Sequence, residues 1–195
     1  KLLHMRKKNE TKEKILINAF DYLNEVGWKN FTFENLSKKK KIKLETIYFF
    51  FENKNFLLRD FSSFIDEQVI LELQDENLKK SEVKDNIFEV LMIRFEKLQP
   101  YKKALQSIFE LLRFQPKMLN TLAKQLFVSL DLVLDLSYAK KGFLFDKFAL
   151  NGLFIIYTNV FNVWLEDDSQ EMNKTMAKLD LLLSRSEYIV SKIKF

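Results

Sequence analysis

Cysteine and histidine, which carry much of the covalent and metal chemistry of proteins, are nearly absent from this sequence. It contains no cysteine and one histidine, His4, close to an end that is expected to fray. The other residues offer no Ser-His-Asp set, no cluster of metal ligands and no glycine-rich phosphate loop. We therefore expect no catalytic residues, no metal, no cofactor and no enzyme activity. Carboxylates such as Asp167 and Asp168 are interpreted as helix caps and solvated charges.

Positive charge is the chemical feature that the sequence does concentrate. Residues 1–61 hold 14 Lys and Arg against 8 Asp and Glu, whereas residues 62–195 hold 18 against 19. A basic N-terminal third is typical of a DNA-binding head, because neutralising phosphates drives most non-specific affinity. A solvated lysine-rich face has the same signature, and a helix dipole alone stabilises the lysine run at residues 38–41. Charge alone leaves both interpretations open.

Helices must position these charges, because 3 glycines and 2 prolines are too few for a sheet-rich fold of 195 residues. An apolar stripe at helical spacing predicts a first helix that ends near Gly27. Its members are Ile15, Leu16, Ala19, Phe20 and Leu23. Thr32 is placed to cap a short second helix. A third short helix follows, and its expected core residues are Ile47, Phe50 and Phe51.

Six further helices account for the rest of an all-α chain with about nine helices. Asn53 is placed to cap the fourth and Ser81 the fifth. The spacing of Asp168 and Glu171 is similar to a capping box and predicts the start of the last helix. The expected ranges are 54–74, 81–100, 101–114, 116–142, 146–166 and 168 almost to the C-terminus.

The segment 31–37, Ile42 and the segment 46–54 together resemble the DNA-binding region of TetR-family transcriptional regulators. Residues 11–16 and Gly27 resemble the first helix of that region and its closing glycine. The resemblance implies a TetR-like fold, with a three-helix helix-turn-helix head on a helical-bundle body. In such a head the second helix of the motif enters the major groove and the first crosses the backbone.

The resemblance divides the chain into three parts. Residues 1–10 are expected to be a flexible basic N-terminus. Residues 11–61 are expected to form the helix-turn-helix domain, including the start of the fourth helix. Residues 62–195 are expected to form a helical domain for ligand binding and dimerisation.

Four positions are implied as DNA contacts by the same resemblance. Thr46 and Tyr48 stand where family members touch phosphates or base edges. Lys54 matches a lysine that grips a phosphate beside the N-terminus of the fourth helix. Thr32 matches a position that caps the second helix and reaches the backbone. Simple capping is the alternative for Thr32, and burial of the ring is the alternative for Tyr48.

Three residues depart from the pattern of the family. Lys41 stands in place of the turn glycine, Lys43 in place of a small N-capping residue, and Glu45 in place of a second small residue. Both lysines favour phosphate, whereas Glu45 repels it unless it reads a cytosine amino group or pairs with a lysine. Selectivity for a DNA sequence is expected to come from Lys43, Glu45, Thr46 and Phe49.

An uncharged stretch at residues 148–165 is long enough to suggest a transmembrane helix. Asn151, Thr158 and Asn162 form a polar seam along it, so a helix in a bundle or at a subunit interface is the preferred interpretation. The TetR resemblance implies that helices eight and nine pair with those of a second copy in a homodimer. No secretory signal is recognised at the N-terminus, which predicts a cytoplasmic protein that is not transmembrane.

A pocket for a hydrophobic small molecule among the middle helices is also implied. The aromatic residues that are candidates to line it are Phe88, Phe109, Phe127, Tyr138, Phe143 and Phe154, and ordinary core packing is the alternative for each. The C-terminal half is in addition similar to the ubiquinone-biosynthesis lipid-binding proteins, which share the TetR fold, at residues 94–105, 164–169 and 175–180. That similarity implies a hydrophobic tunnel for an isoprenoid or acyl chain.

Two functions follow from these resemblances. The first is a sequence-specific DNA-binding transcriptional regulator, with repression as the expected mode, that acts as a homodimer and accepts an apolar effector. The alternative is a TetR-fold lipid- or isoprenoid-binding accessory protein without DNA binding, whose basic face meets a membrane or a partner enzyme. Lys41 and Glu45 are the residues that favour the alternative.

Overall fold

The structure of the chain, a computed structural model, describes residues 2–75, 78, 81–112 and 114–192. These residues form α-helices, two 3-10 turns and connecting loops, with no strand among them. The all-α class predicted from the few glycines and prolines is therefore confirmed. The side chain of His4 lies outside the described residues.

The chain separates into two compact units, and each is described by itself. The first comprises residues 1–64 and 100–123, and the second comprises residues 65–99 and 124–195. Residues 100–123 thus belong with the head rather than with the body to which the sequence assigned them. Helices α4 (Lys54–Glu72) and α7 (Pro116–Leu136) each contribute to both units.

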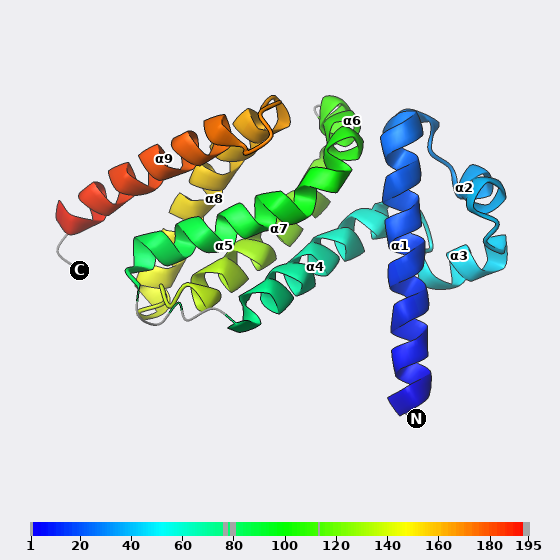
Figure 1. Cartoon of the computed structure of the whole chain (residues 1–195), viewed down its shortest axis with the longest axis horizontal. Helices are drawn as coiled ribbons and strands as arrows, with labels where there is room; N and C mark the ends of the chain where they lie inside the picture. Colours follow the sequence, from blue (N-terminus) through cyan, green and yellow to red (C-terminus); the bar gives the residue numbers. More distant parts are fainter. Residues whose placement is uncertain (1, 76–77, 79–80, 113, 193–195) are drawn as a thin grey trace. The chain divides into compact units, whose positions relative to one another are not determined.

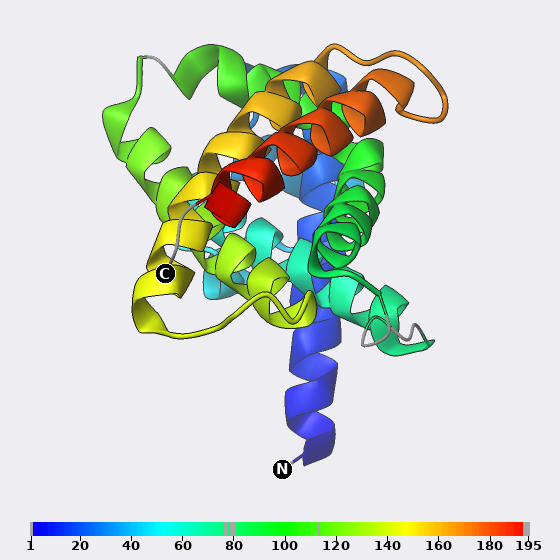
Figure 2. The same cartoon turned by 90° about the vertical axis from the view of Figure 1, so that its left-hand side faces the viewer.

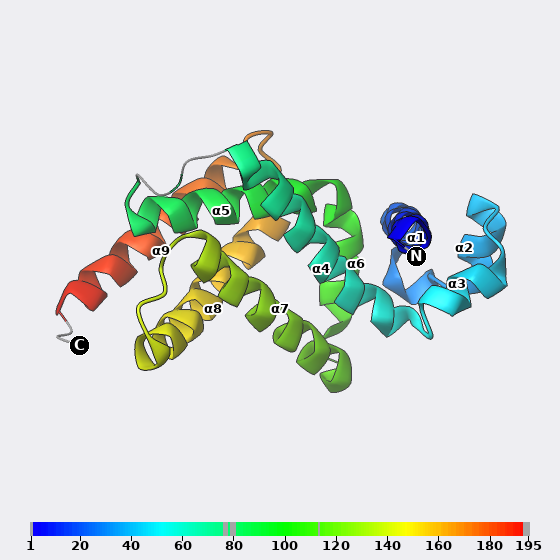
Figure 3. The same cartoon turned by 90° about the horizontal axis from the view of Figure 1, so that it is seen from below.

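The first unit is built around α1 (Leu2–Asn30). Its other complete helices are α2 (Phe33–Lys40), α3 (Leu44–Phe50) and α6 (Lys102–Leu112). Figures 1 and 3 show α2 and α3 lying to one side of α1. Because α1 begins at Leu2, residues 2–10 continue this helix instead of forming a separate flexible terminus.

The apolar stripe predicted for α1 forms the core of the first unit. Ile15, Leu16, Ala19, Phe20 and Leu23 are all buried. The ring of Phe20 stacks on that of Phe61, with 3.6 Å between their centroids, and Tyr101 meets both rings edge-on. Burying such rings contributes about 1.5–3 kcal/mol each.

Gly27 interrupts α1 at the position where the sequence predicts a helix stop. Its φ of 72° lies in the left-handed region, and the helix resumes as far as Asn30. A Cβ at this position would lie 3.5 Å from Cβ of Ser107 on α6. The hydroxyl of Ser107 accepts a hydrogen bond of 3.0 Å from the backbone N–H of Trp28. Gly27 therefore ends the regular helix where α1 meets α6.

The second unit is a bundle of α5 (Val83–Leu98), α8 (Phe143–Leu165) and α9 (Asn173–Lys192) with parts of α4 and α7. Figure 2 shows α8 and α9, coloured yellow to red, running side by side. Phe95 and Tyr157 stack in its core at 5.3 Å between centroids. The buried indole of Trp164 donates a hydrogen bond of 2.9 Å to Gln99.

The predicted starts of α5 and α8 need correction. Helix α5 begins at Val83 after Glu82, so Ser81 is not its cap. Helix α8 begins at Phe143, because Oδ1 of Asp146 reaches back to accept hydrogen bonds from the backbone N–H groups of Lys141 and Gly142. The starts of both helices lie within two or three residues of the expected positions.

The start of α9 is organised by Asp167 rather than by the expected Asp168. The carboxylate of Asp167 is fully buried and accepts hydrogen bonds from Ser169 and from the backbone N–H and hydroxyl of Thr175. Burial acts to raise the pKa of this carboxyl, but the hydrogen bonds from Ser169 and Thr175 outweigh it and hold the pKa well below its ordinary value. Helix α9 consequently begins at Asn173.

Helix α8 is long and apolar enough to cross a membrane by length and composition, with a mean hydropathy of 1.4 in its most apolar stretch. One third of that stretch is buried within the described residues. Leu153, Tyr157 and Trp164 form part of its buried side. The remaining surface of α8 includes exposed apolar side chains, among them Phe148 and Ile155.

Candidate nucleic-acid interface

Helices α2 and α3 form a compact helix-turn-helix with one face in the core of the first unit. Phe33 and Leu36 of α2 and Ile47 of α3 are buried, as is Phe51 directly after α3. Phe50, which the sequence also assigned to the core, is only partly buried. The buried residues hold both helices in place, so the outer face of α3 is rigidly presented.

The turn between the two helices depends on Lys41. This residue has φ 55° and ψ 39°, the left-handed conformation that glycine adopts freely, as the departure from the family pattern required. For a residue with a side chain this conformation costs about 1–2 kcal/mol. Ser37 compensates in part, since its carbonyl accepts the N–H of Ile42 at 3.1 Å and its hydroxyl donates to the Ile42 carbonyl at 2.6 Å.

Thr32 caps α2 as the sequence predicts. Its backbone is extended, and Oγ1 accepts a hydrogen bond of 3.2 Å from the N–H of Asn35. At the start of α3, Lys43 occupies the capping position without a side-chain hydrogen bond. The side chain of Lys43 is exposed and is not used in holding the helix.

Most of the residues of α3 that were predicted to contact DNA lie on its exposed side. Phe49 is 67% exposed and Tyr48 is 46% exposed, Glu45 is exposed and Thr46 is partly buried. Within the described part of the chain no ion pair neutralises Glu45. The exposed surface of α3 is therefore aromatic, with Lys43 directly before the helix and Glu45 in its first turn.

Tyr48 is anchored at both ends of its side chain. Its ring meets Phe33 edge-on at 5.3 Å between centroids, and its hydroxyl donates a hydrogen bond of 2.9 Å to Oε1 of Glu34. Hydrogen bonds from the backbone N–H of Glu34 and from Tyr48 lower the pKa of the Glu34 carboxyl, so it stays ionised at neutral pH. A carboxylate therefore lies beside the phenol on this surface.

Lys54, at the start of α4, is turned toward the protein. Its ammonium donates a hydrogen bond of 3.2 Å to the carbonyl of Trp28 and lies 4.8 Å from the centre of the Trp28 ring. Burial lowers the pKa of Lys54. Its local role is to tie α4 to the end of α1, which the sequence did not indicate because Trp28 is 26 residues away.

Two lysines of the run at residues 38–41 pair with α1. Lys39 lies 2.8 Å from Glu25, and Lys40 lies 3.9 Å from Asp21. Lys38 and Lys41 are exposed and form no ion pair among the residues that the structure describes. The run therefore supplies fewer uncompensated charges than its composition indicates.

The six aromatic residues proposed for a ligand pocket are divided between the two units, with Phe109 in the first and the other five in the second. Phe127 and Phe154 stack on each other at 4.3 Å between centroids. Tyr138 follows α7 with φ 55° and is half exposed, and Phe143 is 70% exposed under the ammonium of Lys147 at 4.1 Å. The other two are Phe88 on α5 and Phe109 on α6 of the first unit.

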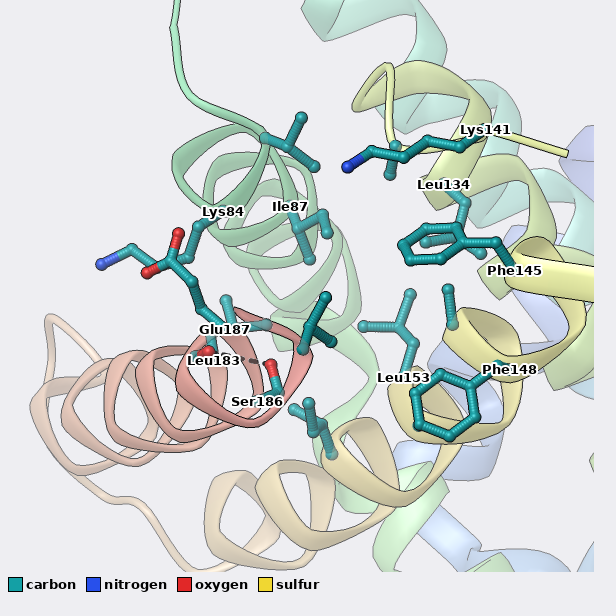
Figure 4. A pocket seen from close by; sticks show the side chains of 16 residues that line it. Lys84, Ile87, Leu134, Lys141, Phe145, Phe148, Leu153, Leu183, Ser186 and Glu187 are labelled. Atoms are coloured by element: carbon teal, nitrogen blue, oxygen red, sulfur yellow. Dashed lines mark hydrogen bonds between the residues drawn. The ribbon is translucent and has the colours of Figure 1, made fainter. Parts of the chain in front are cut away.

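A cavity in the second unit has a different lining. It has a volume of about 240 Å³ and is bounded by α5, the end of α7, the loop after it, α8 and α9 (Figure 4). Phe145 and Phe148 line it with aromatic rings, and Gly152 of α8 lines it without a side chain. None of the six residues proposed from sequence is among its lining residues.

Comparison with known proteins identifies the fold. The structure is similar to a TetR transcriptional regulator from Nitrosomonas europaea ATCC 19718, with a TM-score of 0.78 and 15% identity over 91% of this chain and 98% of the other. It is also similar to a TetR transcriptional regulator from Rhodococcus sp. RHA1, with a TM-score of 0.60 and 15% identity over 90% and 97%. No protein-family profile and no curated protein matches the sequence. The predicted TetR-like fold is confirmed.

Proposed function

We propose that this chain is a DNA-binding transcriptional regulator of the TetR type that acts as a homodimeric repressor. The observation that carries the proposal is the surface of α3, where Tyr48 and Phe49 are exposed on a short helix whose other side is held in the core. Lys41 and Lys43 add cations at the turn and at the start of this helix. Such a helix suits the major groove, where lysine contacts phosphate or guanine and an apolar ring contacts the thymine methyl.

Dimerisation through α8 and α9 is supported by the exposed side of α8. Its exposed positions recur every three or four residues, and between Phe148 and Asn162 none of them is charged. They include Phe148, Asn151, Ile155, Asn159 and Asn162. Protein interfaces are depleted of charge in this way, and an apolar and amide stripe is rarely left to solvent. On α9, Leu181 and Tyr188 are also exposed apolar side chains.

Fluorescence anisotropy with random duplex DNA and with the DNA upstream of the gene for this protein tests the proposal. Binding is expected at about 50 mM salt and is expected to weaken steeply toward about 200 mM. Lys43→Glu is expected to abolish binding, whereas the matched control Lys174→Glu, on α9, is not. Absence of binding to both DNAs at low salt would contradict the proposal.

The mass in solution tests the dimer separately. Light scattering is expected to give twice the 23.4 kDa of one chain. Ile155→Lys is expected to give the monomer mass, because it places a charge in the uncharged stripe. The control Val128→Lys changes an equally exposed residue of α7 and is expected to leave the dimer intact. A monomeric unsubstituted protein would contradict the assignment of α8 and α9.

The lipid-binding alternative is favoured by one observation, the apolar cavity of the second unit. Mass spectrometry of the gently purified protein distinguishes it. A co-purified isoprenoid or phospholipid together with no DNA binding would replace the regulator with the lipid-binding function.

A further inference from the structure

The cavity of the second unit is a mainly apolar space that is partly open to solvent. Ile87 of α5, Leu134 of α7 and Leu153 of α8 line it together with Phe145 and Phe148 (Figure 4). Its volume of about 240 Å³ lies below the 300–1,000 Å³ that is usual for drug-sized ligands. A single short chain fits this space entirely, whereas a two-chain phospholipid or a long polyprenyl chain would enter it only in part.

Gly152 keeps this space open in the middle of α8. A Cβ built on Gly152 meets no atom within 4 Å, so no close approach of a neighbouring helix requires a glycine there. Glycine is less favourable than alanine inside a helix. The visible effect of the missing side chain is the additional volume on the wall of the cavity.

The charged residues of the lining differ in their partners. The ammonium of Lys84 lies 3.5 Å from the hydroxyl of Ser184 and 3.7 Å from the carboxylate of Asp180. The ammonium of Lys141 lies 5.2 Å from the centre of the Phe145 ring and, among the described residues, has no carboxylate partner. Lys141 is therefore the lining cation whose charge is available to a ligand.

The positions of these charges make one end of the cavity positive and leave the other end apolar. Figure 4 shows Lys141 extending across one end of the space above Phe145, with Glu187 on α9 close to Lys84 and away from Lys141. Phe148 and Leu153 lie at the end opposite Lys141. A negative group is attracted to the Lys141 end, and an apolar chain is accommodated at the other.

We propose that this cavity binds a medium-chain aliphatic monocarboxylate, with the carboxylate at Lys141 and the chain directed along Phe148 toward Gly152. A cation of the same size would be repelled by Lys141, and a neutral chain would form no ion pair with it. The role of this ligand as the effector of a regulator rests on the proposed function, whereas the binding itself does not.

Calorimetric titration of the whole chain with octanoate, and with 1-octanol as the uncharged probe of equal length, tests the site. Lys141→Gln is expected to weaken octanoate binding about fivefold, since an exposed ion pair contributes up to about that factor. The same substitution is expected to leave the affinity for 1-octanol unchanged. The control Lys174→Gln, away from the cavity, is expected to change neither.

Gly152→Leu tests the chain end of the cavity. It is expected to weaken the binding of both probes at least tenfold, with Gly152→Ala in between, and far-UV circular dichroism checks that each variant is folded. If Gly152→Leu does not fold, the contrast between Lys141→Gln and Lys174→Gln decides alone. The proposal is overturned if octanoate does not bind, or if Lys141→Gln and Lys174→Gln bind it equally.

The two proposals fail in different ways. If the protein binds octanoate but not DNA, the proposed ligand site is supported and the proposed regulator function is contradicted. If it binds DNA but not octanoate, the regulator function is supported and the ligand site is contradicted.

Discussion

The phenol of Tyr48 donates a hydrogen bond of 2.9 Å to the carboxylate of Glu34, and so joins α3 to α2 on the exposed side of the head. The position of Tyr48 in the motif predicts a contact with DNA. In the structure its hydroxyl donates to Glu34 within the protein. The bond places a negative charge beside the candidate DNA-contacting surface. This pair is therefore the most direct place to test how that surface meets phosphate.

Glu34→Gln is expected to strengthen binding to random duplex DNA severalfold. The substitution removes a charge that repels phosphate, and it weakens the hydrogen bond that occupies the phenol of Tyr48. Anisotropy titrations at two salt concentrations measure the effect. The control is Glu187→Gln, which removes an acidic residue of the second unit, and equal behaviour of the two variants would contradict the prediction.

Lys54→Met is expected to destabilise the protein by about 1 kcal/mol. The change removes the hydrogen bond to the carbonyl of Trp28 and the contact of the ammonium with the indole ring, while it keeps much of the volume of the side chain. Urea unfolding measures the free energy. Lys38→Met, in the exposed run on α2, is expected to change it by less than about 0.5 kcal/mol. A loss that is equal in the two variants would show that the contact with Trp28 contributes nothing.

Asp66→Ala is expected to cost about 3–5 kcal/mol of unfolding free energy, because it leaves Arg94 buried without its carboxylate. Arg94 is 4% exposed and is ion-paired with Asp66, whose other oxygen accepts a hydrogen bond of 2.7 Å from Ser129. Replacing both partners, as Asp66→Ala with Arg94→Met, is expected to be less destabilising than Asp66→Ala alone. Urea unfolding of the single and double variants measures this difference, and a more damaging double variant would contradict the account.

The protein is expected to lose stability as the pH falls below about 4, in part through Asp167. The pKa of this carboxyl is lower in the folded chain than the ordinary value of about 3.9 for an unfolded chain. Below that value the unfolded chain takes up a proton that the folded chain does not, so acid favours unfolding. Asp167→Asn is expected to cost about 1–2 kcal/mol at neutral pH and to flatten the dependence between about pH 3 and pH 5. Urea midpoints across this range measure both effects, and an unchanged slope would remove Asp167 as their source.

Local patterns in the sequence predicted much of the head and of the helix order. The apolar stripe of α1, the cap at Thr32 and the cap at Asn53, whose side chain accepts the N–H of Asn55 at 3.0 Å, depend on residues a few positions apart. Short-range spacing is sufficient for such features. The left-handed turn at Lys41 was also expected, since its position in the motif requires it.

Features that depend on distant residues were not predicted. Asp167 and Asp168 are equivalent in a sequence, and the buried one is distinguished by its hydrogen bonds with Ser169 and Thr175. The candidate pocket residues were aromatic residues of the middle helices, where the TetR resemblance implies a pocket, and two of them, Phe127 and Phe154, stack on each other. The cavity of the second unit is lined by other residues, among them Gly152, which has no side chain to mark it as a lining residue in the sequence.

The backbone of Lys41 has a consequence for how the proposed regulator responds to its surroundings. A glycine in this turn would relieve the left-handed conformation but would remove a cation from the motif. Each phosphate that a lysine neutralises adds about 0.9 to the slope of log affinity against log salt. Under the proposed function, Lys41 thus lowers the stability of the head but makes its DNA binding respond more steeply to ionic strength. The occupancy of an operator would then depend on the ionic strength around the protein as well as on the presence of an effector.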